Sequence, residues 1–256
     1  MSGHVEPGLD TEWLAERARA DPIRHAWAVW DLLKFPHLTS FSTLREGGRP
    51  SAYLLSWHGA APTTVVHWVG EAVDARPLME ALPARPMIAV VPLDHADEVV
   101  RRYAPAQASV VRLMALDVGV PVAPPVEGRA RRLVAADGPA LQGLARTWVD
   151  PISRGYAHAD PALEPVFGAF HLGRLASVAR VQVALPSVWL IGGVLTLPEF
   201  RGLGLSSDVM RLTVHAAVAA GARPALYVQE SNDVARRIYD RLGFALIERR
   251  GWVDAT

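Results

Sequence analysis

The chain has 256 residues, of which 50% are hydrophobic and 20% are charged, a composition that supplies a core and excludes disorder or a coiled coil for the whole chain. Lys plus Arg and Asp plus Glu each total 26, so the formal net charge is zero and does not favour nucleic acid as a partner. The absence of cysteine excludes disulfides and thiolate chemistry and fits a reducing compartment. The longest apolar stretch, residues 188–197, is about half of the roughly 20 residues that cross a bilayer. We expect a cytoplasmic protein that does not bind a membrane.

Prolines mark one seam in the chain. Residues 119–128 contain three prolines and two glycines. Proline fixes φ and removes a backbone donor, so a regular element is not expected there. We therefore predict an N-terminal α/β domain at residues 1–118, a proline-rich linker at 119–128 and a second domain at 129–256.

The N-terminal domain is predicted to be the smaller one, with alternating helices and strands and no recognisable chemical motif. Its His and Trp residues are expected to pack or to face solvent, because no pair has metal-site spacing. In chain order we predict a helix at 21–34, strands at 40–45, 51–57 and 63–69, a helix at 76–82, a strand at 87–91, a helix at 94–103 and a strand at 110–116.

The second domain is easier to interpret from its turns and apolar runs. Asp137 is expected to cap a helix that reaches about Trp148. The other predicted elements are strands at 131–134, 167–172, 175–183 and 188–196, a loop at 198–205, a helix at 206–220, a strand at 226–229, a helix at 232–242 and a strand at 245–249. Predicted core-facing residues are Val209, Leu212, Ala216 and Ala219 on the first of the two last helices, and Val234, Ile238 and Leu242 on the second.

The segment 196–206 joins a buried strand to a helix through a loop with glycines at 202 and 204. Unpaired N–H groups at a helix N-terminus attract anions, and glycine lets the backbone approach a bulky one without a Cβ clash. This pattern suggests a diphosphate ligand, although a tight structural turn explains it as well. The spacing is that of neither a P-loop nor a Rossmann fingerprint.

The loop sequence Arg201-Gly202-Leu203-Gly204-Leu205-Ser206 resembles the pyrophosphate motif of the GNAT superfamily of acyl-coenzyme A-dependent N-acyltransferases. Ser206 departs from that motif by one hydroxymethyl group. Its side chain is small and can act as an additional hydrogen-bond donor to a phosphate. A second resemblance lies downstream, where Leu226-Tyr227-Val228, then Asn232, Ala235, Tyr239 and Gly243-Phe244 follow the family's strand and Asn-initiated helix. The resemblance covers about residues 129–254.

The resemblance implies an α/β fold with a mixed, splayed central sheet flanked by helices. It implies transfer of an acetyl group from acetyl-coenzyme A to a primary amine of a small molecule or peptide, without a metal. The residues implied to hold the coenzyme are Val194, Leu195 and Thr196 beside the pantetheine arm, Arg201, Gly202, Leu203, Gly204, Leu205 and Ser206 around the diphosphate, and Asn232, Ala235 and Tyr239 on the following helix. The N-terminal domain resembles a degenerate GNAT-like half without a coenzyme loop.

Tyr239 is the implied acid that protonates the departing thiolate, because a phenol with a pKa near 10 stays protonated at neutral pH. The base is not identified. Some members of the family carry a Glu where this chain has Leu190. Substitutes that stay open are Glu199, Glu230, Glu164, His171 and a chain of water molecules.

Two other classes of function stay open. One is a catalytically silent acyl-coenzyme A-binding sensor or scaffold, and the other is a nucleotide-binding module that uses the same anion loop. We also expect the N-terminal domain to dock on the second domain and to shape either the acceptor pocket or the interface of a homodimer.

Overall fold

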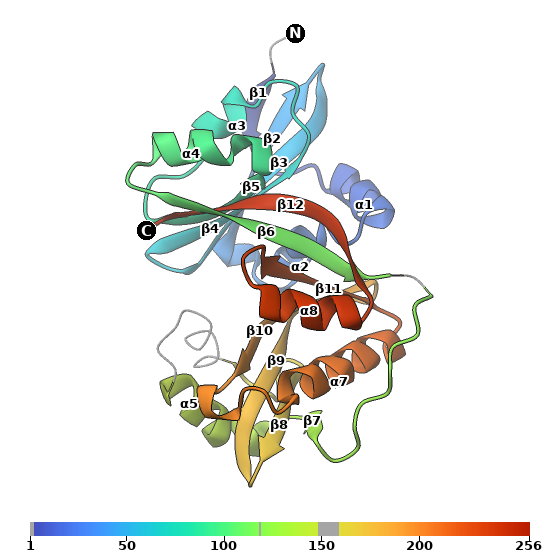
Figure 1. The fold of residues 1–256 in the computed structure, drawn as a ribbon. Coiled ribbons are helices and arrows are strands. Elements are labelled where there is room, and N and C mark those ends of the chain that lie inside the picture. Colours follow the sequence, from blue (N-terminus) through green and yellow to red (C-terminus); the bar gives the residue numbers. More distant parts are fainter. Residues whose placement is uncertain (1–2, 118, 148–158) are drawn as a thin grey trace. The chain divides into compact units, whose positions relative to one another are not determined.

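The computed structural model describes residues 3–117, 119–147 and 159–256 (Figure 1). The chain forms two compact units. The first comprises Met1–Leu113, Val228–Asn232 and Ile247–Thr256, and the second comprises Met114–Tyr227 and Asp233–Leu246. The predicted helix end at Trp148 lies outside the described residues.

The first unit is built on strands in the order β1-β2-β3-β4-β5-β12-β6. Neighbours from β1 to β4 are antiparallel, β4 and β5 are parallel, and β5 and β12 are antiparallel. The strands are β1 (His4–Pro7), β2 (Thr39–Glu46), β3 (Arg49–Ala60), β4 (Thr63–Gly70), β5 (Met87–Pro92), β6 (Gln107–Leu116) and β12 (Phe244–Ala255), of which β6 and β12 each extend into the second unit.

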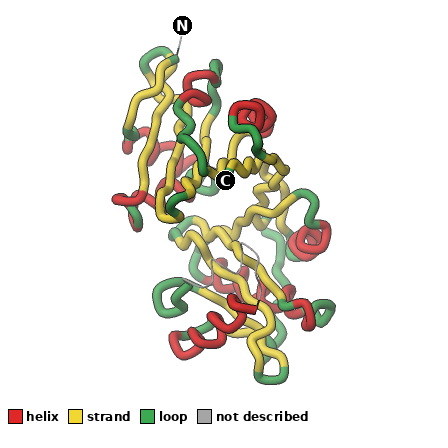
Figure 2. Tube along the Cα trace, turned by 90° about the vertical axis from the view of Figure 1, so that its left-hand side faces the viewer, coloured by secondary structure: helices red, strands yellow, loops and turns green. Residues whose placement is uncertain are grey.

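Helices cover both faces of these strands (Figures 1 and 2). Side chains alternate along β3, so that Leu54 packs into one core and Tyr53 and Leu55 pack into another. The helices are α1 (Thr11–Ala20) and α2 (Ala26–Lys34), which pack with Tyr53, and α3 (Arg76–Glu80) and α4 (Ala96–Arg102), which pack with Leu54. The predicted helix start at residue 21 is wrong, because Asp21 caps a separate turn by accepting from Arg24 N at 3.1 Å.

The C-terminal strand belongs to the first unit over most of its length. Strand β12 pairs with β5 from Arg250 opposite Pro92 to Ala255 opposite Met87. This backbone ladder groups residues 247–256 with the first 113 residues, whereas the predicted domain boundaries group them with the second domain.

The second unit contains strands in the order β11-β10-β9-β8-β7. Helix α7 packs across β7 to β10, and α5 packs on β9. The elements are β7 (Ala130–Arg132), α5 (Gly138–Thr147), β8 (Val166–His171), β9 (Arg174–Ala184), β10 (Val188–Thr196), α7 (Leu205–Ala219), β11 (Arg223–Gln229, whose last two residues lie in the first unit) and α8 (Asp233–Arg241). The prediction of a mixed α/β sheet flanked by helices is confirmed.

Strand β10 opens at its C-terminal end. Its parallel register with β11 runs from Val188 opposite Arg223 to Ile191 opposite Leu226 and stops there, although β10 continues to Thr196. On its other side, the register with β9 shifts at a bulge between Gly192 and Leu195. The last residues of β10, before the loop that follows, are therefore no longer in register with β11.

No helix within the described residues is long and apolar enough to span a membrane.

Candidate functional site

The loop between β10 and α7 has a shape that requires glycine. After a short 3₁₀ turn at Pro198–Phe200, Gly202 and Gly204 both adopt φ +79°, a region that costs energy for residues with a Cβ. Gly204 is the N-cap of α7. A Cβ built on either glycine meets no atom within 4 Å, so the backbone here borders open space and not a neighbouring chain segment.

The amides of this loop are free to bind an anion. No described residue accepts a hydrogen bond from the backbone N–H groups of residues 202–206. These donors lie at the start of a helix of 15 residues, where the aligned peptide dipoles add partial positive charge. The loop thus offers donors, positive potential and room, which fit a diphosphate group.

Arg201 and Thr196 frame the entrance to the loop. The exposed Arg201 guanidinium donates from Nε to the Thr196 carbonyl oxygen at 3.4 Å. Thr196 Oγ1 lies 2.7 Å from the hydroxyl of Ser177, and Ser177 also donates to the Leu195 carbonyl at 3.0 Å. Ser177 is fully buried on β9, so it fixes the end of β10. Val194 is half-buried on the same strand.

Helix α8 presents Tyr239 on its buried side. Tyr239 is 6% exposed, packs against Phe244 with ring centroids 5.9 Å apart, and its hydroxyl has no hydrogen-bond partner among the described residues. Burial raises the pKa of Tyr239, so the phenol stays protonated. Ala235 is half-buried on this helix, whereas Asn232 precedes the helix and falls in the first unit.

Two predicted core faces need correction. Val234 is 66% exposed, because the buried side of α8 runs through Tyr239 and Leu242. On α7, Ala219 is exposed and Leu212 and Ala216 are half-buried. The residues that are buried on α7 are Leu205, Asp208, Val209, Met210, Thr213, Val214 and Ala217.

Three of the predicted substitutes for the base lie in the second unit. Glu199 pairs with Arg174 at 3.2 Å, and Glu164 pairs with Arg180 at 2.7 Å. His171 packs against Phe200 with ring centroids 5.5 Å apart and the ring planes tilted by 59°. The position that carries Glu in some relatives is occupied here by Leu190, which is buried.

Glu230 lies in the first unit. Arg112 and Arg249 bind its Oε1 at 2.5 and 2.9 Å, and their hydrogen bonds lower the pKa of this carboxyl. A carboxylate held in this way is a weak proton acceptor. Within the described ranges, no three His, Asp or Glu side chains are gathered so as to hold a metal ion.

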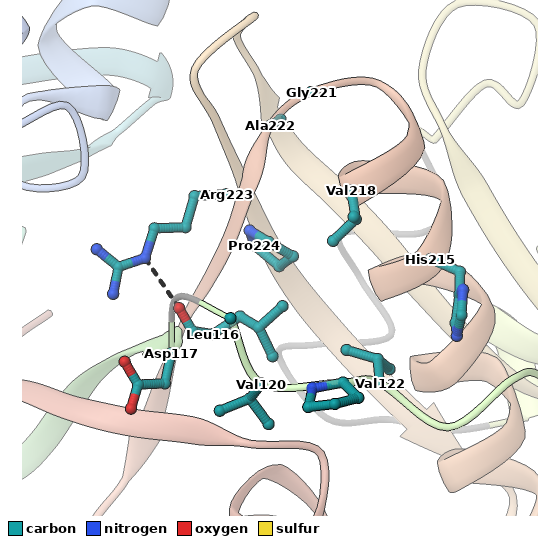
Figure 3. A pocket seen from close by; sticks show the side chains of 12 residues that line it. Leu116, Asp117, Val120, Val122, His215, Val218, Gly221, Ala222, Arg223 and Pro224 are labelled. Carbon is teal, nitrogen blue, oxygen red and sulfur yellow. Dashed lines mark hydrogen bonds between the residues drawn. The ribbon is translucent and has the colours of Figure 1, made fainter.

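A pocket of about 530 Å³ lies elsewhere in the second unit, beside the C-terminal part of α7 (Figure 3). Its walls are mainly apolar, and Arg223 donates from Nε to the Leu116 carbonyl at 2.9 Å. Its lining residues are Leu116, Asp117, Gly119–Val122, His215, Val218 and Gly221–Pro224. None of the loop residues 201–206, which are called the anion cradle from here on, lines it, so the pocket is separate from the cradle.

Sequence reasoning missed three residues that shape the loop. Ser177, Arg129 and Asp208 bond to the end of β10, to the loop or to each other. No motif contains them, and only Asp208, four residues after Gly204, has a spacing that hints at the helix start.

Comparison with known proteins agrees with this geometry. The FR47-like protein family matches residues 166–253, which include β10, the glycine loop, α7 and α8. Mycothiol acetyltransferase from Corynebacterium aurimucosum is 30% identical over 115 residues, which is 42% of this chain. The aligned part makes up 35% of that relative's length, so the chain spans about a third of it.

Solved structures resemble the whole chain. A tandem GNAT protein from the clavulanic acid biosynthesis pathway covers 100% of this chain and 99% of its own, with 17% identity and a TM-score of 0.60. A GCN5-related N-acetyltransferase from Sphaerobacter thermophilus covers 98% and 94%, with 16% identity and a TM-score of 0.62. At these identities the likeness shows the fold. That fold is the GNAT fold, and the match to the FR47-like family lies within it at residues 166–253, in the C-terminal half.

Proposed function

We propose that this protein transfers an acetyl group from acetyl-coenzyme A to a primary amine of a small molecule or peptide. The observation that carries the proposal is the loop at residues 201–206, where two glycines with φ +79° precede α7 and the amides of residues 202–206 are bonded by no described residue. An acyl donor built on a diphosphate matches that cradle in charge and in the room it needs. Coenzyme A would supply the activated thioester.

Each predicted residue has a proposed task. The amides of residues 202–206, with Arg201, would bind the diphosphate, and the backbone of Val194, Leu195 and Thr196 would line the pantetheine arm. Asn232 and Ala235 are proposed to border the same ligand. The proposed contact with the pantetheine arm is supported by the end of β10, because the register with β11 stops at Ile191.

Tyr239 is proposed as the acid. The amine nitrogen would form a bond to the acyl carbon, the carbon–sulfur bond would break, and the Tyr239 hydroxyl would give its proton to the thiolate. A protonated phenol that no described residue bonds suits this task. For the base we favour water, because Glu199 and Glu164 are each bound to an arginine.

The proposed setting is the cytoplasm, which the lack of cysteine fits. The neutral net charge does not favour nucleic acid as a partner, which agrees with an acceptor that is a small-molecule or peptide amine. The N-terminal half is proposed to contribute to acceptor binding or to a homodimer and not to hold a second coenzyme.

The test is a thiol-release assay with acetyl-coenzyme A against small amines, aminoglycosides, amino acids and peptides, run beside calorimetry with coenzyme A and ATP. The proposal expects coenzyme A to bind in preference to ATP, and at least one amine to release thiol. Binding of coenzyme A without release on any amine would favour the sensor or scaffold. Preference for ATP would favour the nucleotide-binding module.

A further inference from the structure

The proline-rich segment 119–128 is attached along α7 within the second unit. Near the C-terminal end of the helix, His215 Nε2 lies 2.9 Å from the Ala123 carbonyl oxygen, and Figure 3 shows His215 beside Val122 of this segment. At the other end of the helix the segment delivers Arg129 to the glycine loop. The segment predicted as a linker thus leads directly into Arg129, which reaches the anion cradle.

Arg129 makes two contacts there. Its Nη2 donates to the Leu203 carbonyl oxygen at 2.7 Å, and its Nε lies 3.2 Å from Asp208 Oδ2. The Asp208 side chain is 4% exposed, whereas that of Arg129 is 43% exposed. A second cation, Arg211, lies 3.8 Å from this carboxylate. A buried carboxylate needs a cation nearby, so Asp208 anchors the guanidinium that holds Leu203.

The contact with Leu203 sets the direction of a cradle amide. The Leu203–Gly204 peptide is trans, so the Leu203 carbonyl and the Gly204 N–H point in opposite directions. When Arg129 holds the carbonyl, the Gly204 N–H faces away from Arg129. The next peptide is fixed as well, because Asp208 N donates to the Gly204 carbonyl at 3.1 Å. Gly204 has a flexible backbone, and both peptides around it are thereby locked.

We propose that Arg129, anchored by Asp208, is a positioning residue that orients the Gly204 amide toward the diphosphate of coenzyme A. This inference rests on the proposed function. Arg129 acts through the loop, so its loss should weaken ligands that contain the diphosphate and leave pantetheine, which lacks it, unaffected. Once Arg129 is removed, Asp208 keeps only the longer contact with Arg211 among the described residues, so its carboxylate would also repel the diphosphate.

The experiment measures the Kd of coenzyme A by calorimetry and that of pantetheine at millimolar concentration, for wild type, Arg129→Ala and a matched control. The control is Arg132→Ala, which changes an exposed arginine at the end of β7 with which no described residue forms an ion pair. We expect Arg129→Ala to weaken coenzyme A about tenfold, the size of one charge-assisted hydrogen bond, with unchanged pantetheine binding. Arg132→Ala should match wild type.

A second variant distinguishes a specific effect on the loop from a general loss of folding. Adding Asp208→Asn to Arg129→Ala removes the carboxylate that has lost its nearer cation, so coenzyme A affinity should partly recover, by about threefold. Equal Kd values for Arg129→Ala and Arg132→Ala, or an equal loss for both ligands, would overturn the role of Arg129. Neither result would bear on the proposed function. Wild-type protein that does not bind coenzyme A would overturn the proposed function first.

Discussion

Each unit of the molecule contains a parallel strand pair whose connection includes a helix. In the first unit β4 leads through α3 to β5, and in the second unit β10 leads through α7 to β11. The second of these connections contains the proposed anion cradle. Comparing the two connections shows what makes one of them a site.

The amides at the start of the first connection are bound by a side chain from β2. Glu46 Oε1 accepts hydrogen bonds from the amides of Val73 and Asp74 at 3.0 and 3.2 Å. A Cβ on Gly70 would lie 2.6 Å from the Ser51 carbonyl oxygen, so this glycine allows close packing of the backbone. Helix α3 has only five residues.

In the second connection no carboxylate of the described residues binds the amides of residues 202–206, and a Cβ at Gly202 or Gly204 would meet nothing within 4 Å. The difference lies in which group satisfies the amides: a protein carboxylate in the first unit, and a proposed ligand in the second. Glycine at the end of a strand is therefore not enough to indicate a site.

The largest effect is expected from Gly204→Glu. The new side chain would strain a residue at φ +79° and place a negative charge in the cradle, so coenzyme A binding should fall below detection in calorimetry. Gly204→Ala adds the strain without the charge and should show an intermediate loss. Unchanged affinity in a folded Gly204→Glu protein would mean that the diphosphate binds elsewhere.

Tyr239→Phe should lower kcat by about 10²- to 10⁴-fold, with the KM for acetyl-coenzyme A nearly unchanged. Stability should hardly change, since no described residue bonds the hydroxyl. Tyr103→Phe is the matched control, because it removes a hydroxyl that donates to the Leu82 carbonyl at 3.1 Å in the first unit. That variant should lose stability and keep kcat. A Tyr239→Phe enzyme within about threefold of wild type would return the acid role to water.

In the first unit, Asp31 should affect stability and not binding. It is buried on α2 without an ion-pair partner among the described residues, and burial raises its pKa from 3.8 to about 7. The folded state thus keeps a proton that the unfolded state loses above pH 4, so stability should fall as pH rises from 4 to 7, by roughly 3 kcal/mol. Asp31→Asn should remove that slope in urea unfolding. A wild-type stability that does not fall over this range would refute the raised pKa.

The smallest effect is expected from Glu46→Ala. It leaves two amides without their acceptor and should lower the free energy of unfolding by about 1 kcal/mol, while coenzyme A affinity stays at the wild-type value. Glu71→Ala, which removes an exposed carboxylate from the same loop, should do neither. Weaker coenzyme A binding in Glu46→Ala would contradict the claim that only the second connection takes part in binding the ligand.

Local patterns predicted the elements of the second unit well. The apolar run of β10 and the glycine loop before α7 lie where the sequence indicated them, because both depend on short-range signals. Helix α1 was missed, since its sequence has few apolar residues. Asp10 stabilises its start by accepting from Trp13 N at 3.0 Å.

Long-range pairing was beyond sequence reasoning. Nothing in residues 247–255 indicates that β12 pairs with β5, far back in the chain. The buried face of α7 was assigned wrongly because it includes two polar residues, Asp208 and Thr213. Thr213 bonds the Val209 carbonyl at 2.8 Å, and Asp208 meets Arg129. Apolar periodicity does not register buried polar groups whose partners come from elsewhere.

The most direct test of the contrast between the two connections is hydrogen–deuterium exchange of the full chain with and without coenzyme A. The account predicts slower exchange in peptides that cover residues 201–206 and unchanged exchange in those that cover residues 70–76. Protection of residues 70–76, or none at 201–206 with coenzyme A bound, would contradict it.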